Sequence, residues 1–445
     1  MKSASYISLK KCLSVILCAI IAALLFGCEA AAQAPVTAGD AHDAALSGQA
    51  QVEIPAQTAS PSAVSSQAGI GTAFAISMPN GGGNPSASSF PVEDVRRITD
   101  DLLATKAEQL LQYGATEGYA PLRAAISEHM LKPKGVVADE SCILPTTGSI
   151  QGMDLICRIF IDRGDRVLVE APTFLGVLQT LNIAGAELVS VPSDDEGVVT
   201  DELEELIKKH RPKLFYCIPT FQNPSGKTLG LERRKAIARL ATKYDMIVAE
   251  DDPYCDLRYR GEALPPIKSF DESGHVILLN SFSKIISPGI RVGSAYSTPE
   301  IIRKMTIAKQ GVDTHTPNLT QAIAAEFLNR GLLPVQLKRI CPEYGARLDA
   351  MLNAMDAYFP EECSFTRPEG GLFVWGECKG LDMLKLVSRA TEEKKIAYIP
   401  GVHFYSHPEG REGTFRLNFS GTAFENIDTG IRKMGELMKE ALAEE

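Results

Sequence analysis

Short apolar runs alternate with longer helical patterns through the middle of this chain, and this alternation narrows the folds that it can adopt. The runs are bounded by turn or polar residues and cover 167–169, 188–191, 214–218, 246–249 and 276–279. Helical patterns separate most of them, such as 201–210 and 231–244. Apolar runs this short, enclosed by helices, are typical of buried and mostly parallel strands. We therefore predict a large α/β domain over residues 112–328.

The rest of the globular chain carries a different pattern. With 445 residues, the sequence is longer than one simple core usually requires. From residue 329 to 445, helical patterns accompany a few alternating stretches such as 371–375. We predict a smaller α+β domain there, which residues 71–111 join. The expected fold class is thus α/β, with a large, mostly parallel sheet flanked by helices and a second, smaller α+β domain.

The first 28 residues have the layout of a leader. Three lysines (Lys2, Lys10 and Lys11) precede an apolar run over 12–28 that ends in small residues. This order is typical of a secretory signal peptide. The run ends in LFGC, which resembles a bacterial lipoprotein box, and in such boxes the cysteine, here Cys28, is lipidated and becomes the new N-terminus. Phe26 departs from that pattern, where a smaller residue is usual.

Residues 29–70 are rich in Ala, Ser, Gln, Thr and Pro. They have few large apolar side chains to offset the entropy of folding, so we predict a low-complexity tether. Leader and tether together predict a membrane-anchored protein. Two alternatives stay open: an uncleaved anchor, because the apolar run is only slightly short of a membrane span, and a mistaken start codon in front of a cytoplasmic enzyme.

Cysteine usage and charge argue against several kinds of site. The seven cysteines beyond the leader are Cys142, Cys157, Cys217, Cys255, Cys341, Cys363 and Cys378. Their number is odd and no CxxC pair occurs, so we predict no metal site and no disulfide framework, and expect small buried hydrophobic residues instead. The formal net charge is −10, and no basic run follows the first dozen residues. We therefore predict no nucleic-acid partner.

Polar residues gather at the ends of the predicted strands and before one predicted helix. In an open α/β sheet, ligands bind beyond the carboxyl ends of the strands. The residues at such places are Gly148, Ser149, Ile150 and Gln151, then Asn223, then Asp251 and Tyr254, and finally Ser281, Ser283 and Lys284. If the strands are neighbours, these residues converge on one site.

Two of these groups suit particular chemistry. Residues 148–151 open a helix, where free N–H groups and the helix dipole favour an anion, although Gly-Ser before a helix is more often an ordinary N-cap. Lys284 can bond covalently to a carbonyl group if burial and nearby cations lower its pKa. A lysine taken at random is a surface residue. Ser281, Ser283 and Arg291 together suit a phosphate, which distinguishes this lysine.

The segment SFSKIISPGIR (281–291) resembles the lysine motif of the class I/II aminotransferases, which are fold-type I enzymes that depend on pyridoxal 5′-phosphate. Five more segments resemble motifs of that family in the same order: YGATEGYAPLR (113–123), TTGSIQGMDL (146–155), QNPSG (222–226), EDDPYCDLRY (250–259) and RLNFS (416–420). The subgroup that this chain most resembles comprises the 2-aminoadipate and kynurenine aminotransferases and the enzyme-like halves of MocR regulators. The resemblance implies transfer of an amino group from an L-amino acid to a 2-oxo acid by a ping-pong mechanism.

The resemblance also implies a role for each matching residue. Lys284 is implied to bind the cofactor covalently and to move a proton, and Asp251 to pair with the pyridine nitrogen. Tyr254 and Asn223 are implied to contact the ring hydroxyl, and Phe174 to stack on the ring. The residues implied to surround the phosphate are Gly148, Ser149, Ile150, Gln151, Ser281, Ser283 and Arg291.

Two further implied residues concern the substrate and a partner chain. Arg416 is implied to bind the substrate α-carboxylate in a bidentate fork, beside Asn223. Tyr113 is implied to reach the phosphate of the neighbouring subunit, which makes a homodimer with shared active sites the expected assembly. The family's Gly-Gly-Leu-Pro is replaced by Asn-Gly-Gly-Gly-Asn-Pro at 80–85, so the side chain of the amino donor stays open.

Other functions compete with transfer. Pyridoxal phosphate also supports a C–S β-lyase on the same fold. A lipid-anchored protein that holds an amino acid without turning it over is a further alternative. A MocR-type regulator is disfavoured, because residues 1–70 contain a leader and a tether but no winged helix-turn-helix pattern.

Overall fold

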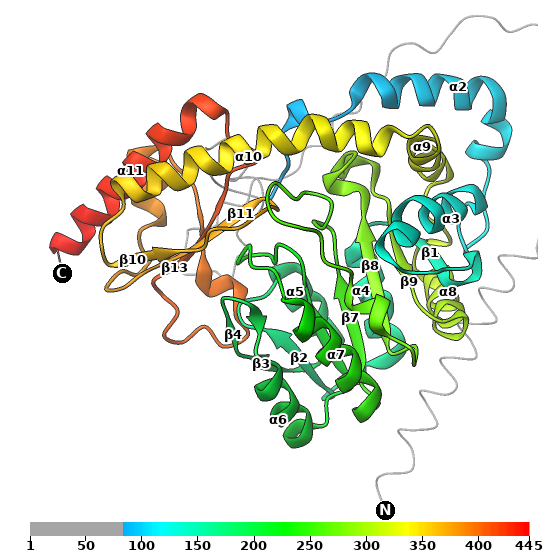
Figure 1. Ribbon diagram of the computed structural model, residues 1–445, viewed down its shortest axis with the longest axis horizontal. Helices are drawn as coiled ribbons and strands as arrows, with labels where there is room; N and C mark the ends of the chain where they lie inside the picture. Colours follow the sequence, from blue (N-terminus) through cyan, green and yellow to red (C-terminus); the bar gives the residue numbers. More distant parts are fainter. Residues whose placement is uncertain (1–82, 445) are drawn as a thin grey trace, which may run out of the picture. The chain divides into compact units, whose positions relative to one another are not determined.

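The five predicted apolar runs are neighbouring strands of one sheet in the computed structural model, which describes residues 83–444. The sheet has seven strands in the order β1-β9-β8-β7-β6-β2-β3 (Figure 1). Its strands are β1 (Ile143–Thr146), β2 (Arg166–Glu170), β3 (Glu187–Val191), β6 (Leu214–Cys217), β7 (Ile247–Asp251), β8 (Val276–Ser281) and β9 (Gly293–Tyr296). Strands β3, β2, β6, β7 and β8 are parallel, and β9 is antiparallel to both β8 and β1. The predicted mostly parallel sheet is thereby confirmed.

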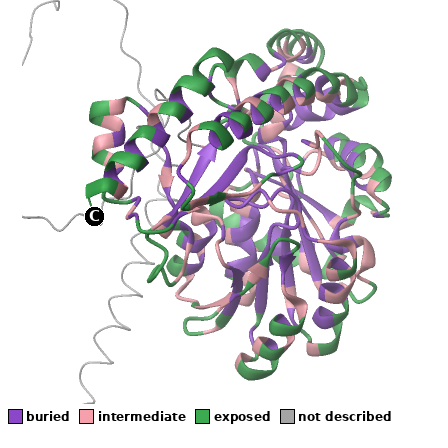
Figure 2. Ribbon diagram, turned by 60° about the vertical axis from the view of Figure 1, so that its left-hand side comes forward, coloured by how far each residue is buried: buried purple, intermediate pink, exposed green. Residues whose placement is uncertain are grey.

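Both faces of the sheet are covered, which explains why its strands are continuous apolar runs (Figure 2). Neighbouring residues of a strand point to opposite faces. Val167 and Val169 join the core under α4 (Ser149–Phe160) and α5 (Leu175–Ala184), whereas Leu168 joins the core under α6 (Thr200–His210) and α7 (Leu231–Tyr244). The predicted helices over 201–210 and 231–244 correspond to α6 and α7.

A second, antiparallel sheet carries the C-terminal part of the chain. Its strands, in the order β10-β11-β13-β12, are β10 (Cys363–Phe365), β11 (Phe373–Cys378), β13 (Thr414–Asn418) and β12 (Ile399–Pro400). The long helix α10 (Leu332–Tyr358, yellow in Figure 1) packs against α11 (Phe424–Glu444) beside this sheet. Near its other end, α9 (Asn318–Asn329) packs against α2 (Val92–Leu111) and α3 (Ala120–Ile126), and α8 (Pro299–Asp313) packs on α4. A pair of two-residue strands, β4 (Ser193–Asp194) and β5 (Gly197–Val198), completes the strands of residues 83–444.

The cysteine prediction needs a correction. Cys363 of β10 lies opposite Cys378 of β11 in the strand register, and the two form a disulfide. The pair was missed because fifteen residues separate the cysteines and only the hairpin register brings them together. Of the five free cysteines within residues 83–444, Cys157 and Cys217 are buried, as expected of small hydrophobic residues, whereas Cys142, Cys255 and Cys341 are only half-buried.

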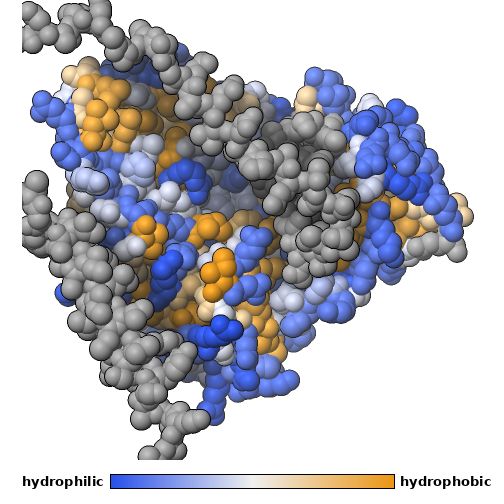
Figure 3. All heavy atoms as spheres, turned by 180° about the vertical axis from the view of Figure 1, so that it is seen from behind, coloured by the Kyte–Doolittle hydropathy of each residue, from blue (hydrophilic) through white to orange (hydrophobic). Residues whose placement is uncertain are grey.

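The described residues include the surface of the globular part but not the predicted leader. No helix within 83–444 is long and apolar enough to cross a bilayer, and no cluster of side chains in that range suits a metal ion. Apolar and polar residues are interspersed on the face in Figure 3. The predicted leader (1–28), its Cys28 and the tether (29–70) lie outside the described residues, and the predicted domain boundaries stay a prediction.

Candidate active site

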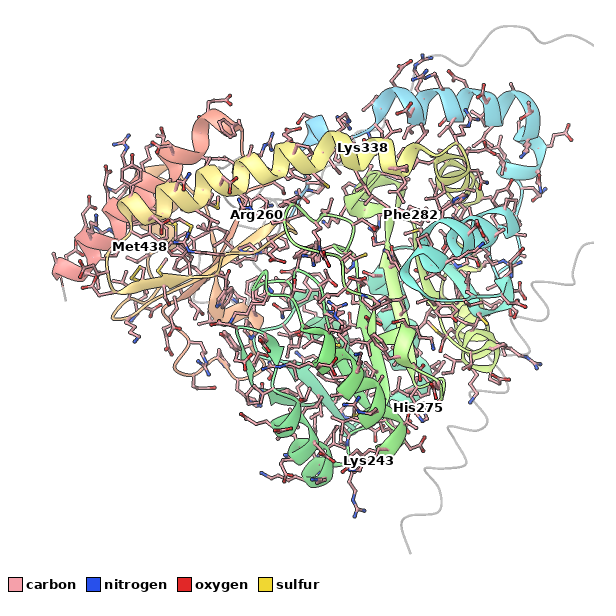
Figure 4. The ribbon with its side chains drawn as sticks, in the orientation of Figure 1. Lys243, Arg260, His275, Phe282, Lys338 and Met438 are labelled. Atoms are coloured by element: carbon pink, nitrogen blue, oxygen red, sulfur yellow. A yellow bond between two sulfur atoms is a disulfide. The ribbon has the colours of Figure 1, made fainter. Side chains whose placement is uncertain are left out.

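The carboxyl ends of β7 and β8 bring the central side chains together. Asp251 is the last residue of β7, and its partner in the register of the neighbouring strand β8 is Leu279. Figure 4 shows β8 running from His275 at one end to Phe282 just beyond the other. Lys284 follows in the turn over Phe282–Lys284. The predicted convergence at the strand ends is therefore the arrangement that the sheet produces.

The amine of Lys284 is deprived of water and placed among cations. Burial lowers the pKa of Lys284 to about 8, with smaller contributions from the guanidinium groups of Arg416 and Arg291. Its Nζ donates a hydrogen bond of 2.9 Å to the carbonyl oxygen of Gly83. These are the conditions under which a lysine amine becomes a nucleophile and a proton carrier near neutral pH.

The lowered pKa predicts how cofactor uptake depends on pH. Because only the unprotonated amine attacks an aldehyde, the rate at which the cofactor-free protein takes up pyridoxal phosphate should rise about tenfold per pH unit below pH 8. It should level off above that value rather than near 10.5. Stopped-flow absorbance between pH 6 and 10 measures this, and a rate that still climbs at pH 9.5 would contradict the assignment of Lys284 as the group that titrates.

Asp251 is a buried carboxyl with one unused oxygen. Its Oδ2 accepts a hydrogen bond of 2.9 Å from the hydroxyl of Tyr216, while Oδ1 is buried and has no hydrogen-bond partner among the described residues. Burial raises the pKa of Asp251 to about 7; hydrogen bonds from Tyr216 and Ser149 oppose the rise, and the charge of Asp252 adds to it. A protonated pyridine nitrogen would give Oδ1 a donor and would stabilise the carboxylate. Tyr216 itself was not predicted, and its only signal was a tyrosine within an apolar run.

Asn223 connects two residues that the sequence placed in separate roles. Its Nδ2 donates to the hydroxyl of Tyr254 at 3.2 Å, and its Oδ1 accepts from Nη1 of Arg416 at 2.8 Å. All three side chains are buried. The residues that the resemblance assigns to the ring hydroxyl and to the substrate carboxylate are therefore joined by one amide.

Arg416 lies between two aromatic rings. Its guanidinium carbon is 4.2 Å from the ring centre of Phe373 and 5.0 Å from that of Phe404. Burial lowers the pKa of Arg416 to about 10, and the nearby Tyr254 opposes that change. The rings fix the plane of the fork and exclude water, both of which strengthen binding of a carboxylate. Neither Phe373 nor Phe404 was predicted, because their sequence positions carry no polar signal.

Replacing Arg416 by lysine should raise KM for the amino acid by about 100-fold, because an ammonium cannot form the planar two-bond contact. The effect on kcat should be smaller, since the change removes ground-state binding. Steady-state kinetics measure both constants. Arg411→Lys is the matched control, because the Arg411 guanidinium also lies over an aromatic ring, that of Tyr405, but is exposed. Equal effects of the two substitutions would contradict the assignment.

The first turn of α4 forms a cradle for an anion. Gly148, the N-cap residue, has a φ of 84°, a conformation that favours glycine. A Cβ at Gly148 would lie 2.3 Å from Nη2 of Arg291. That nitrogen also donates to the carbonyl oxygen of Thr147 at 2.9 Å. The free N–H groups of a helix N-terminus and a guanidinium therefore meet at one place, as a phosphate requires.

The other residues predicted at the phosphate differ in what they offer. Ser281 and Ser283 are hydrogen-bonded to each other, with 3.0 Å between their hydroxyl oxygens. The amide of Gln151 is engaged elsewhere, since it accepts from Lys309 and donates to Asp313. Ile150 packs on the core with its side chain. Ile150 and Gln151 thus offer their backbone N–H groups rather than their side chains.

The two remaining predicted residues are Phe174 and Tyr113. Phe174 is the N-cap residue of α5, and a Cβ at Gly176 would lie 2.8 Å from its ring. Tyr113 is 82% exposed and its ring meets His315 edge to face. The structure of one chain does not bring Tyr113 to Lys284.

Comparison with known proteins identifies the family. The family model described as Aminotransferase class I and II matches residues 81–434. The chain belongs to this aminotransferase family. The aromatic-amino-acid aminotransferase 1 of Thermococcus litoralis is 42% identical to it over 367 residues, which cover 81% of this chain and 88% of the relative. The 2-aminoadipate transaminase of Thermus thermophilus is 41% identical, with coverages of 81% and 90%.

A solved structure extends the similarity to three dimensions. The crystal structure of Pyrococcus horikoshii kynurenine aminotransferase in complex with PMP matches this aminotransferase with a TM-score of 0.79 and 41% identity, covering 82% of this chain and 91% of that one. The protein is thus a fold-type I aminotransferase that depends on pyridoxal phosphate, as the resemblance implied.

The geometry of this aminotransferase fits its cofactor. Lys284 would hold the aldehyde carbon, the unused oxygen of Asp251 would face the ring nitrogen, and the cradle at Gly148 and Arg291 would hold the phosphate. When bound, pyridoxal phosphate supplies an aldehyde and a ring that accepts electrons from the substrate Cα. Lys284 Nζ can accept and return a proton near neutral pH, and Arg416 would orient the amino acid through its carboxylate.

Proposed function

We propose that the amino donor of this aminotransferase is an aromatic L-amino acid. The observation that carries the proposal is the series of edge-to-face rings around Arg416: Tyr254 meets Phe373 at 5.9 Å between ring centres, and Phe404 meets Trp375 at 5.6 Å. Aromatic walls favour an aromatic side chain next to the carboxylate contact, because ring pairs add stability beyond burial of apolar area. The 42% identical relative is named for aromatic amino acids.

The charges near this site also favour an apolar side chain. A donor with a second carboxylate, such as 2-aminoadipate, needs a further cation. Arg347 is a buried arginine near Asn84, because Ser420 contacts both residues. It donates hydrogen bonds to the carbonyl oxygen of Ser420 and to the carboxylate of Glu343. Its charge is thus already paired with Glu343.

A panel of donors with 2-oxoglutarate as acceptor tests this proposal. The value of kcat/KM for phenylalanine or kynurenine should exceed that for 2-aminoadipate at least about tenfold, the discrimination expected from one or two kcal/mol of pocket contacts. A higher value for 2-aminoadipate would overturn it. Pyruvate release from cystathionine without any 2-oxo acid would instead favour lyase chemistry.

We further propose that two copies of the chain share their active sites. Tyr113 and the neighbouring Leu111 are largely exposed in one chain, which supports a partner at this surface. Mixing two inactive variants, Tyr113→Ala and Lys284→Ala, should restore activity, because one site of the hybrid dimer then has both native residues. Failure to restore activity after subunit exchange, verified by mass, would contradict shared sites.

We also propose that the leader is a lipoprotein signal that anchors the enzyme at a membrane. The order of lysines, apolar run and Cys28 supports this, and so does the Cys363–Cys378 disulfide, because disulfides persist in oxidising compartments. The mass of the mature N-terminus from the native host tests it. An acylated Cys28 is the expected result, and an intact Met1 would contradict it.

A further inference from the structure

An amine and a thiol lie in close contact outside the active site itself, and the thiol belongs to the residue next to Tyr254 in the sequence. Lys134 ends the turn over Lys132–Lys134, and its Nζ is 2.8 Å from Sγ of Cys255. Cys255 directly follows Tyr254, in the loop after β7. The same Nζ is 3.1 Å from Oδ1 of Asp256, and the thiol donates to the carbonyl oxygen of Asp252 at 3.6 Å. Segments 121 residues apart in sequence thus meet at a nitrogen and a sulfur.

The distance between these two atoms is the informative quantity. A separation of 2.8 Å is ordinary for nitrogen and oxygen, but sulfur is the larger atom. Two single bonds that meet at one atom, such as N–Cα–C in the backbone, span about 2.5 Å. One bridging atom therefore fits between Nζ and Sγ with little movement.

No other free cysteine in residues 83–444 is placed in this way. The free cysteines there are Cys142, Cys157, Cys217, Cys255 and Cys341. Cys341 is the nearest comparison: it is half-buried as well, but its thiol donates to the carbonyl oxygen of Asp256 at 3.7 Å and has no amine partner. The contact with Lys134 thus sets Cys255 apart from the other thiols.

We propose that Lys134 and Cys255 form a covalent cross-link on oxidation, with one oxygen atom bridging Nζ and Sγ. The oxidant is a peroxide. One hydrogen peroxide converts the thiol to a sulfenic acid, so an S–O bond forms and one water leaves. The nitrogen then bonds to the sulfenic oxygen while a second hydrogen peroxide takes up two electrons, the N–H and O–H hydrogens are lost, and two waters leave. Two molecules of a dithiol reverse both steps: each is oxidised to its disulfide, the bridging oxygen leaves as water, and the free amine and thiol return.

The neighbouring carboxylates decide how fast this happens. Burial lowers the pKa of Lys134, but the charge of Asp256, the contact with Cys255 and the charge of Asp252 together outweigh burial and raise that pKa. The amine must therefore first give up a proton, and Asp256 is in contact to accept it. Burial, together with Asp252 and Asp256, raises the pKa of the Cys255 thiol. A neutral thiol reacts slowly with peroxide, so the test needs excess oxidant and a long exposure.

The cross-link would affect the active site through the loop that carries Tyr254. It would join the loop that carries Tyr254 to the segment after α3, and Tyr254 contacts Asn223 of the active site. Oxidation should therefore change the rate of amino transfer reversibly. The chemistry itself does not depend on which amino acid the enzyme uses.

Peptide mass analysis of the peroxide-treated, full-length holoenzyme tests the proposal. The expected result is a pair of peptides containing Lys134 and Cys255, whose mass equals their sum plus one oxygen and minus two hydrogens. This species should disappear after treatment with dithiothreitol. Cys255 recovered as a free thiol, a sulfinic or sulfonic acid, or a disulfide, with Lys134 unmodified, would overturn the proposal.

Three variants sharpen the comparison. Lys134→Arg keeps a cation beside Asp256 but removes the amine, and Cys255→Ser removes the sulfur; neither should yield the cross-linked mass. Cys341→Ser should yield it as the native chain does. Cofactor absorbance reports correct folding in every sample, and the Cys363–Cys378 peptide does so in the samples without dithiothreitol. The same mass shift in Lys134→Arg would also overturn the assignment of Nζ.

Discussion

Lys284→Ala should lower kcat for amino transfer by at least about 10⁴-fold, at the upper end of what a positioned acid–base group contributes. The substitution removes both the covalent contact with the cofactor and the amine that carries the proton. Lys284→Arg should be similarly inactive, because a guanidinium keeps the charge but stays protonated at any accessible pH. Steady-state turnover with a saturating amino donor measures the loss.

Two controls separate chemistry from folding in that experiment. Lys243→Ala changes an exposed lysine on α7, which Figure 4 shows at the opposite end of the sheet from Phe282, and it should leave kcat unchanged. Borohydride reduction of the native holoenzyme should attach the cofactor to the peptide that contains Lys284. Attachment to a different lysine would refute the assignment.

Asp251→Asn should lower kcat/KM by about 10²–10⁴-fold, the equivalent of 3–5 kcal/mol for removing one partner of a buried ion pair. An amide cannot carry the negative charge that keeps the ring nitrogen protonated, so the ring becomes a poorer electron acceptor. The absorbance spectrum of the bound cofactor and the single-turnover rate with an amino donor measure the two parts of this effect.

Asp252→Asn is the matched control for that substitution. Asp252 is also buried, and the cations that lower its pKa are Lys134 and Arg234. Lys134 donates to Cys255 and Arg234 donates to the carbonyl oxygen of Leu229, so neither was assigned to the active site. We expect Asp252→Asn to lower the free energy of unfolding and to leave the cofactor spectrum unchanged. A spectral change in Asp252→Asn, with none in Asp251→Asn, would reverse the two roles.

The sequence predicted those parts of the site that depend on local order along the chain. Asp251, Tyr254 and Lys284 follow apolar runs, and parallel neighbouring strands necessarily bring their carboxyl ends to one edge. Gly148 was identifiable because a glycine before a helix admits an anion. The choice of Asp251 over Asp252 came from the spacing to Tyr254. An unused oxygen does not distinguish the two carboxyl groups, because Oδ1 of each is buried without a hydrogen-bond partner among the described residues.

Two features that the sequence did not predict depend on register between distant segments. Phe373 and Phe404 enclose Arg416 only because β11 pairs with β13 and the turn over Gly401–Phe404 packs beside them. The Cys363–Cys378 disulfide depends on the register of a hairpin. Strands β1 and β9 read ILPT and GSAY, so proline or small and polar residues interrupt the apolar run that would have identified them.

The hydrogen bond between Lys284 and the carbonyl oxygen of Gly83 has a consequence for which aldehydes react with this amine. A buried amine with a pKa of about 8 can attack any small aldehyde that enters the site. Such an aldehyde must first displace the 2.9 Å hydrogen bond from Lys284 to Gly83, and it has no phosphate whose contacts would compensate for the loss. The cofactor brings a phosphate, and its contacts with Arg291 and the first turn of α4 compensate for that loss. This hydrogen bond therefore disfavours the reaction of Lys284 with small aldehydes and favours an aldehyde that carries a phosphate.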